Sequence, residues 1–285
     1  MVNKLVLGTV QFGLNYGINN FLDKPSVSQV FEMLDLAFDN DISTLDTADA
    51  YGDASQLIGK YNSKYPKKFL INTKFNASIS KLAVQLEKSL IKLNTDFINI
   101  YFYHNFNDFI NYPDIQVQLL KLKESGKIQK IGLSVYENEE IKQACESVLI
   151  DVIQLPFNLL DNNSQRGNLI KSAKMIGKEV QVRSIFLQGL FFKLLNELTP
   201  KLFPLKPHLK KIHEIAKYSR ISIEQLALNY ALQHKDIDNV IIGVDSIQQL
   251  IIDIEMAKNK ISNEEIEAVN QILVQEVKLL NPKNW

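Results

Sequence analysis

The fold that this sequence predicts is α/β, a (β/α)₈ TIM barrel, and three observations lead to it. Short β-branched or aromatic runs alternate with amphipathic stretches along the whole chain, which indicates parallel strands joined by helical crossovers. Eight runs are suitable for strands, which favours closure into a barrel over an open sheet. The 285 residues, 46% of them hydrophobic, suffice for one barrel-sized core. We therefore expect a single domain over residues 1–285.

The predicted strands are short and apolar, as strands of a buried parallel sheet are. They cover residues 5–9, 44–46, 69–74, 97–103, 128–134, 152–155, 180–184 and 240–243.

The predicted helices place apolar residues at i, i+3 and i+4, the spacing of an amphipathic helix. Ser26 and Gln29 have the pattern of a capping box ahead of the first of them. The expected helices cover residues 30–38, 82–93, 115–123, 139–145, 223–232 and 247–257.

Two segments depart from this repeat. Residues 187–207 contain Pro200, Pro204 and Pro207, and we expect a long loop after strand 7 that acts as a lid or binding loop. Residues 262–275 begin with Ser262, a suitable N-cap, and we expect one extra C-terminal helix there.

Composition excludes several classes of protein. Lys+Arg and Asp+Glu both number 32, so no net charge favours nucleic acid or an anionic membrane. The single cysteine, Cys145, can form neither an internal disulfide nor a multi-cysteine metal site, which is typical of a reducing cytoplasm. Gly8 comes too early for a secretory hydrophobic region, and no later apolar run approaches ~18 residues. We expect a soluble, cytoplasmic protein with a small-molecule ligand, no nucleic-acid partner and no membrane partner.

Four side chains able to move a proton or stabilise a charge follow three successive predicted strands. Asp46 and Tyr51 follow one strand, Lys74 the next and His104 the third. Each alone is compatible with a turn, packing or structural role. If the strands are parallel neighbours, however, the four groups meet at the end of the barrel where such folds carry their chemistry. The sequence therefore predicts an enzyme.

The segment from Asp46 to Gly52, Asp-Thr-Ala-Asp-Ala-Tyr-Gly, closely resembles the Asp-Thr-Ala-x-x-Tyr-Gly signature of the aldo-keto reductases. The resemblance continues in the family's order over nearly the whole chain. It includes Gly59, Lys74 in Ile-Asn-Thr-Lys, His104 in Tyr-Phe-Tyr-His, Gly132-Leu133-Ser134, Gln154 in Asp-Val-Ile-Gln, and Val-Ile-Ile-Gly-Val from Val240. It implies a reductase of aldehydes or ketones that uses NADPH or NADH, with Asp46, Tyr51, Lys74 and His104 as its catalytic tetrad.

The chemistry of these residue types agrees with that implication. Reduction of a carbonyl by hydride leaves charge on oxygen, so a proton donor must lie within hydrogen-bond reach, and we expect Tyr51 to be that donor. A neighbouring ammonium, here Lys74, favours the ionised form of a phenol, and Asp46 would keep Lys74 protonated. His104 would orient the carbonyl oxygen.

No Gly-x-Gly-x-x-Gly follows the first predicted strand, so a Rossmann-type pyrophosphate turn is not expected. The resemblance instead implies a dinucleotide held across the barrel mouth. It assigns Ser134 and Gln154 to the nicotinamide carboxamide, and Ser184, Leu187 and Gly189 to the pyrophosphate. The other expected cofactor contacts are Gly8, Thr9, Arg183, Gly243, Asp245 and Gln249. No metal-ligand spacing occurs in the sequence, and no metal site is expected.

Three positions depart from the family's pattern. Ser134 is followed by Val135 where many relatives have Asn. Arg183 takes the place of an aromatic ring, and it would either serve the cofactor or an acidic substrate or form a structural ion pair at the barrel rim. Residues 243–249 lack a cation for a 2′-phosphate, and Asp245 would repel one. We therefore expect NADH to be used at least as well as NADPH, although Lys258 or Lys260 could still approach from the following helix.

The substrate is expected to contact Phe12, Tyr16, Asn105 and Phe106. Aromatic rings mixed with amides suit a sugar-like carbonyl, because rings stack on C–H faces while amides bind hydroxyls; rim packing is the alternative for Phe12 and Phe106. The opening Leu-Gly-Thr-Val-Gln-Phe-Gly also resembles an aldo-keto reductase subgroup associated with surface-polysaccharide sugars. A monomer or weak homo-oligomer is expected.

Two other functions remain open on the sequence. One is a regulatory protein of the same fold that binds a nicotinamide nucleotide. The other is a barrel isomerase or lyase that uses Lys74 as a base or Schiff-base nucleophile.

Overall fold

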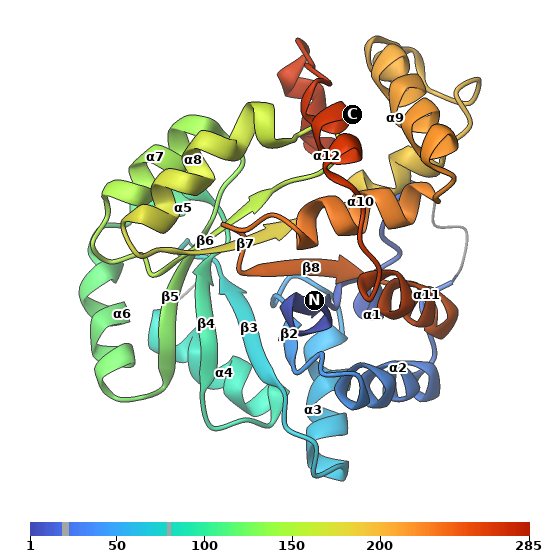
Figure 1. Cartoon of the computed structure of the whole chain (residues 1–285). Coiled ribbons are helices and arrows are strands. Elements are labelled where there is room, and N and C mark those ends of the chain that lie inside the picture. Colours follow the sequence, from blue (N-terminus) through green and yellow to red (C-terminus); the bar gives the residue numbers. More distant parts are fainter. Residues whose placement is uncertain (19–22, 79–80) are drawn as a thin grey trace.

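Eight parallel strands close into a barrel in the described part of this computed structural model, residues 1–18, 23–78 and 81–285 (Figure 1). The strands follow one another around the barrel in chain order, and β1 closes the sheet against β8 with Gly8 opposite Gly243. The strands are β1 (Leu5–Gly8), β2 (Thr44–Asp46), β3 (Leu70–Phe75), β4 (Ile98–Tyr103), β5 (Ile128–Ser134), β6 (Val152–Pro156), β7 (Glu179–Arg183) and β8 (Asn239–Gly243).

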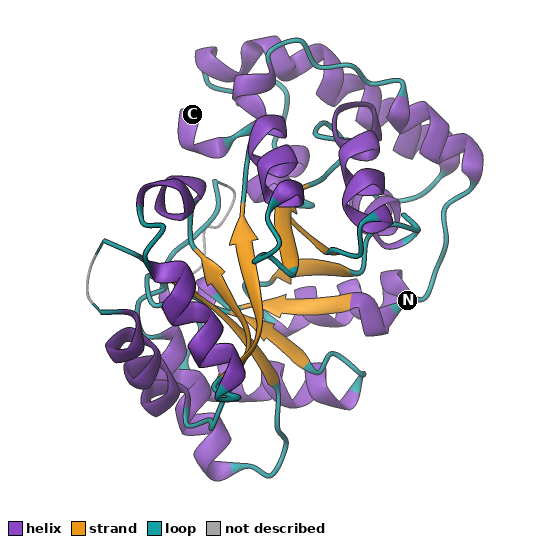
Figure 2. Cartoon of the chain, turned by 90° about the vertical axis from the view of Figure 1, so that its left-hand side faces the viewer, coloured by secondary structure: helices purple, strands orange, loops and turns teal. Residues whose placement is uncertain are grey.

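Every predicted strand is present, and no strand end is displaced by more than one residue. The strands are short and apolar because both of their faces are covered: all residues of β1 and β6 are buried. Figure 2 shows the strands inside an outer layer of helices. Most of the core lies between these two layers, and a smaller cluster, Ile100, Phe102 and Val152, is separate from it.

The helices occupy the connections between strands, as the apolar spacing predicts. Ser26 and Gln29 form the expected capping box at the start of α2. The helices are α1 (Val10–Gly13), α2 (Val27–Asp39), α3 (Ala54–Lys64), α4 (Leu82–Leu93), α5 (Phe106–Asn111), α6 (Ile115–Glu124), α7 (Asn138–Glu146), α8 (Asn163–Met175), α9 (Lys206–Ser219), α10 (Ile223–Leu232), α11 (Ile247–Ala257) and α12 (Asn263–Asn270).

The extra C-terminal helix is shorter than expected. It begins at the predicted N-cap, Ser262, with a complete capping box, but it ends at Asn270 and not at residue 275. The buried amide of Asn162 donates to the carbonyls of Val269 and Ile272, at 2.8 and 2.9 Å. These side-chain hydrogen bonds satisfy backbone groups at the helix end and allow the chain to leave the helical path.

The long connection after β7 is present, and it contains two 3₁₀ helices, Leu187–Phe192 and Pro200–Leu205. Gln188 and Gly189 interrupt the first of them with positive φ angles of 56° and 89°. Figure 1 places the C-terminal segment, α12 and α9 above the strands, on the side reached by this connection.

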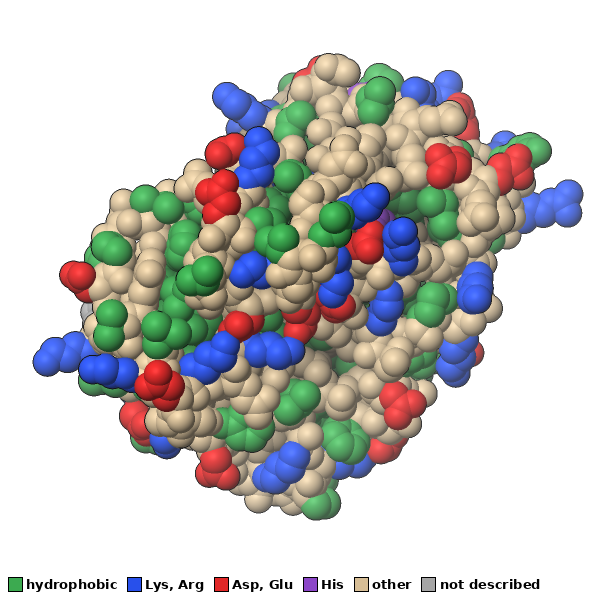
Figure 3. All heavy atoms as spheres, turned by 60° about the vertical axis from the view of Figure 1, so that its left-hand side comes forward, with side chains coloured by type: hydrophobic (Ala, Val, Ile, Leu, Met, Phe, Trp, Pro, Cys, Tyr) green, Lys and Arg blue, Asp and Glu red, His purple; other side chains and the backbone are tan. Residues whose placement is uncertain are grey.

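No helix in the described ranges is long and apolar enough to cross a membrane. Basic and acidic side chains are interspersed over the face of the molecule drawn in Figure 3.

Candidate active site

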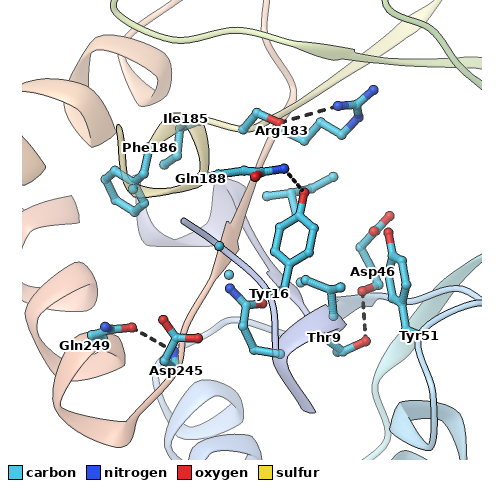
Figure 4. Close-up of a pocket in the computed structure, with 18 of the residues that line it drawn as sticks. Thr9, Tyr16, Asp46, Tyr51, Arg183, Ile185, Phe186, Gln188, Asp245 and Gln249 are labelled. Carbon is cyan, nitrogen blue, oxygen red and sulfur yellow. Dashed lines mark hydrogen bonds between the residues drawn. The ribbon is translucent and has the colours of Figure 1, made fainter. Parts of the chain in front are cut away.

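A cavity of about 600 Å³ opens at the C-terminal ends of the strands (Figure 4). It collects residues that lie at, or one position from, the C-terminal ends of seven of the eight strands. These are Gly8, Asp46, Lys74, His104, Ser134, Arg183 and Gly243. Asp46, Tyr51, Lys74 and His104 all line it, so the four candidate catalytic residues lie in one place.

Lys74 and Asp46 form a buried ion pair at the floor of this cavity. Nζ of Lys74 donates to Oδ1 of Asp46 and, at 3.1 Å, to the carbonyl of Thr47. Only 3% of the Lys74 side chain and 6% of the Asp46 side chain are exposed. Burial by itself lowers the pKa of Lys74, but Asp46 and Tyr51 raise it, and the net pKa lies above its ordinary value. Lys74 is therefore a cation at neutral pH.

Gln154 donates a hydrogen bond to the second carboxylate oxygen of Asp46. Its Nε2 donates to Oδ2 at 2.9 Å, and the side chain is fully buried beneath the cavity. Gln154 is not one of the residues that line the cavity. The expected contact of Gln154 with the nicotinamide carboxamide stays a prediction, and the geometry adds a contact that the sequence did not indicate, from its N–H to Asp46. Its Oε1 has no partner among the described residues.

Two glycines, Gly13 and Gly52, allow the backbone at Tyr51 to pack closely against the end of α1. A Cβ on Gly13 would lie 1.9 Å from the carbonyl oxygen of Tyr51, and a Cβ on Gly52 would lie 2.4 Å from the carbonyl oxygen of Gly13. Gly52 also has a φ of +54°, which favours glycine. This close approach of two backbone segments fixes the backbone of Tyr51. The ring centroid of Tyr51 lies 5.3 Å from Nζ of Lys74.

His104 completes the group. Its ring lies 6.5 Å from that of Tyr51, centroid to centroid, at an interplanar angle of 85°. Burial, together with the positive charges of Lys74 and Lys283, lowers the pKa of His104 to about 4. The imidazole is therefore neutral at physiological pH and can donate one N–H.

Most of the expected cofactor contacts line the cavity. They are Gly8, Thr9, Ser134, Arg183, Ser184, Gly189, Gly243, Asp245 and Gln249. Leu187 does not line it, because its side chain is completely buried in the hydrophobic core. Its expected contact with the pyrophosphate stays a prediction.

Of the expected substrate contacts, only Tyr16 lines the cavity. Phe12 is fully buried in the core, where an aromatic side chain gains most from burial. Asn105 is the N-cap of α5 and accepts a 2.9 Å hydrogen bond from the N–H of Asp108. Phe106 packs on Phe109, with 6.0 Å between ring centroids. In this structure these three side chains serve local structure, and their contact with a substrate stays a prediction.

Several lining residues escaped the sequence reasoning. Tyr136 and Phe186 stand only a few residues beyond strand ends, and that position was a usable signal. The others are brought in by helices or late segments and carry no local signal. They include Glu224, Asp253 and Lys283.

The two sides of the cavity differ in charge. Figure 4 shows Asp46 and Tyr51 on one side, with Asp245 and Gln249 opposite. Asp245 shares its end of the cavity with carboxylates from α10 and α11, Glu224 and Asp253. Burial, with Glu224 nearby, raises the pKa of Asp253 to about 7. This end of the cavity is therefore acidic.

Arg183 forms no salt bridge with any described residue, so a structural ion pair at the rim is not its role. Its guanidinium lies 4.1 Å from the ring centroid of Tyr136 and donates to the carbonyl of Val135 at 3.2 Å. Among the described residues, no group of three or more His, Cys, Asp or Glu side chains is arranged to hold a metal ion.

Known proteins are similar to this chain in sequence and in architecture. The model of the aldo/keto reductase family matches residues 4–274. The chain is 26% identical over 298 residues to probable aldo-keto reductase 1 of Glycine max, covering 94% of this chain and 84% of that protein. It is 23% identical to the L-glyceraldehyde 3-phosphate reductase of Escherichia coli O157:H7, covering 94% and 89%.

The fold is likewise similar to that of an aldo-keto reductase from Bacillus halodurans in its holo form. The TM-score is 0.77 at 20% identity, over 96% of this chain and 95% of that one. At this identity the likeness concerns the fold alone.

Proposed function

Because this chain belongs to the aldo/keto reductase family and is an NAD(P)H-dependent oxidoreductase, we propose that it reduces an aldehyde or ketone with Tyr51 as the proton donor. One observation carries the proposal: Lys74, buried and charged, faces the ring of Tyr51 in the cavity that also holds a neutral His104. The proposal takes residues 1–285 as one domain, acting as a cytoplasmic monomer or weak homo-oligomer.

In the proposed mechanism the reduced nicotinamide supplies hydride when bound. The phenol of Tyr51 gives its proton to the carbonyl oxygen, and the ammonium of Lys74 stabilises the phenolate that remains. Asp46 keeps Lys74 charged and in place, and Gln154 fixes Asp46. His104, being neutral, donates a hydrogen bond to the carbonyl oxygen without competing with Tyr51 as an acid.

The residues of the cavity suit a dinucleotide. Gln11 lines the cavity with an Oε1 that has no partner among the described residues, so an acceptor is available for a carboxamide N–H. Gly8, Gly189 and Gly243 leave room for close approach to the backbone. Ser134 and Gln11 would hold the nicotinamide end, Ser184 and Gly189 the phosphates, and Asp245 and Gln249 the adenosine.

We extend the proposal to the choice of cofactor: NADH is used at least as well as NADPH. The support is the acidic side chains at the adenosine end, Asp245 and Glu224, which disfavour a 2′-phosphate and favour free ribose hydroxyls. Asp253, whose pKa is about 7, adds only part of a negative charge at neutral pH. Lys258 is engaged with Glu255. Dissociation constants for both cofactors test this point, and a preference for NADPH above about tenfold, ~1.4 kcal/mol, would contradict it.

A hydroxylated, sugar-like carbonyl is the substrate class that the remaining polar wall suits. Tyr16 accepts a 2.8 Å hydrogen bond from the amide of Gln188, and both line the cavity with Gln11. These residues offer one aromatic face and two amides, and they take over the role that the sequence assigned to Phe12, Asn105 and Phe106.

A steady-state assay tests the proposal. Oxidation of NADH and NADPH is followed with a panel of aldehydes, ketones and sugar carbonyls, and turnover of at least one carbonyl is expected. Tight nucleotide binding without turnover of any carbonyl would favour a regulatory protein. Borohydride trapping of a carbonyl on Lys74 would favour Schiff-base chemistry, which the charged state of Lys74 opposes, since an ammonium is no nucleophile.

A further inference from the structure

Two cations line the cavity next to the proposed reaction centre. Arg183 ends β7, and Lys283 lies in the 3₁₀ helix Pro282–Asn284. Both approach the same ring: the guanidinium of Arg183 lies 4.1 Å, and Nζ of Lys283 4.7 Å, from the centroid of Tyr136. Segments 100 residues apart in the chain thus bring two positive charges to one aromatic platform.

The aromatic residue between the two cations, Tyr136, is held in a fixed position by its neighbours. The buried guanidinium of Arg166 donates to the carbonyl of Tyr136 at 2.7 Å while it pairs with buried Asp161. The N–H of Tyr136 donates to Glu140 at 2.6 Å. Tyr136 is therefore held at both backbone groups, and the two cations stand over a fixed surface.

Neither cation has a counter-charge among the residues that the structure describes. Within the described ranges, Arg183 and Lys283 take part in no salt bridge, and the guanidinium of Arg183 donates only to neutral oxygens, those of Val135 and Ser184. Asp46, the carboxylate at this side of the cavity, is already engaged by Lys74 and Gln154. Two like charges brought together without a partner repel each other, and an anion between them relieves that cost.

This positive charge reaches the reaction centre. After burial and Lys74, Lys283 is the next contributor that lowers the pKa of His104, and Arg183 adds to it. Figure 4 shows Arg183 extending toward the side of Asp46 and Tyr51, away from Asp245 and Gln249. The cavity is therefore positive where the carbonyl would react and acidic at its far end.

Building on the proposed carbonyl reduction, we propose that Arg183 and Lys283 are specificity-determining residues, and that the substrate is an aldehyde or ketone bearing an anionic group, a carboxylate or a phosphate. The guanidinium binds one edge of the anion with its planar fork, and the ammonium of Lys283 adds a second charge from the open side. Because Lys283 is exposed, its contribution is screened by salt.

Matched pairs of substrates test this inference. One pair is 4-oxobutanoate and its methyl ester, and the other is glyceraldehyde 3-phosphate and glyceraldehyde. The quantity measured is the ratio of kcat/KM between the anionic and the neutral member, for the wild type, Arg183→Gln and Lys283→Gln, with the dissociation constant of NADH measured alongside. Lys278→Gln is the matched control, since Lys278 is exposed on the same C-terminal segment and does not line the cavity.

In the wild type the ratio should exceed about tenfold for at least one pair, ~1.4 kcal/mol, and should fall as salt is added. Each substitution should remove most of the preference, and Lys278→Gln should leave it unchanged. A preference confined to one pair identifies the anion as carboxylate or phosphate.

Three results overturn the inference. A ratio near one in the wild type means that no anion is recognised, while turnover of the neutral members keeps the proposed function intact. An unchanged ratio in both variants, with weaker NADH binding, means that the cations hold the cofactor's phosphates. No turnover of any member defeats the proposed function itself and this inference with it.

Discussion

Gln154 donates a 2.9 Å hydrogen bond from its buried amide to Oδ2 of Asp46. The other oxygen of Asp46 accepts from Lys74, so the carboxylate is fixed by two donors, one on each oxygen. In the proposed mechanism Gln154 thereby acts through Asp46 and Lys74, as a positioning residue.

Replacing Gln154 with Leu should lower kcat by about ten- to a hundredfold, because a hydrogen bond to a charged group contributes ~1.5–3 kcal/mol. With Asp46 less well held, Lys74 should lose its proton more readily, and the alkaline limb of the kcat–pH profile should move to lower pH. Gln165→Leu is the control, since Gln165 also gives up one hydrogen bond, to Val274, away from the cavity. An unshifted pH profile in Gln154→Leu would reduce its role to packing.

The lowered pKa of His104 predicts how stability depends on pH. The unfolded histidine takes up its proton near pH ~6.5, whereas the folded one does so only at about 4. Folding stability should therefore fall as pH drops from ~6.5 to ~4, by up to about 3 kcal/mol for this group, and His104→Gln should remove that part of the fall. Urea denaturation of both proteins across this range measures it. Equal pH dependence in the two proteins would contradict a depressed pKa.

The raised pKa of Asp253 predicts the opposite dependence of folding stability on pH. Its folded pKa is about 7, above the unfolded value of ~3.9, so the folded protein holds a proton that the unfolded chain releases. Stability should decrease as pH rises from ~4 to ~7, and Asp253→Asn should be more stable than the wild type at pH ~8 by a few kcal/mol at most. The difference should become small at pH ~3, below the unfolded pKa of ~3.9, where the carboxyl of Asp253 is protonated in both the folded and the unfolded state. Thermal melts of both proteins at these two pH values measure it.

Gly13→Ala tests the backbone support of Tyr51. The added Cβ would meet the Tyr51 carbonyl oxygen at 1.9 Å, so the loop must shift, at a cost of ~1–3 kcal/mol in stability. Because the shift moves Tyr51, kcat should fall more than KM rises. Gly126→Ala is a useful comparison: Gly126 has open space around its Cβ position but a φ of +73°, so its cost should be in stability, with kcat retained.

The strands and the convergence of the four candidate catalytic residues in one cavity were predictable because their signals are local. Parallel strands buried on both faces appear as apolar runs, and the groups at their C-terminal ends meet wherever the barrel closes. The capping box at Ser26 and the N-cap at Ser262 were predictable for the same reason.

The rest depended on tertiary contacts. The end of α12 is set by Asn162, more than a hundred residues away. Phe12 resembles a rim residue in sequence but points into the core. Lys283 reaches the cavity from the C-terminal segment, and Asp253 from the inner side of α11. No local pattern distinguishes such residues from ordinary surface or helix positions.

A single-turnover experiment with Tyr51→Phe tests the central claim most directly. Excess enzyme and NADH are mixed with a carbonyl that the wild type reduces, and the rate of NADH oxidation is recorded together with the dissociation constant of NADH. The variant keeps the aromatic ring and loses only the acidic hydroxyl, so NADH should bind as before while oxidation slows on the order of 100-fold or more. Oxidation at the wild-type rate in Tyr51→Phe would contradict the account.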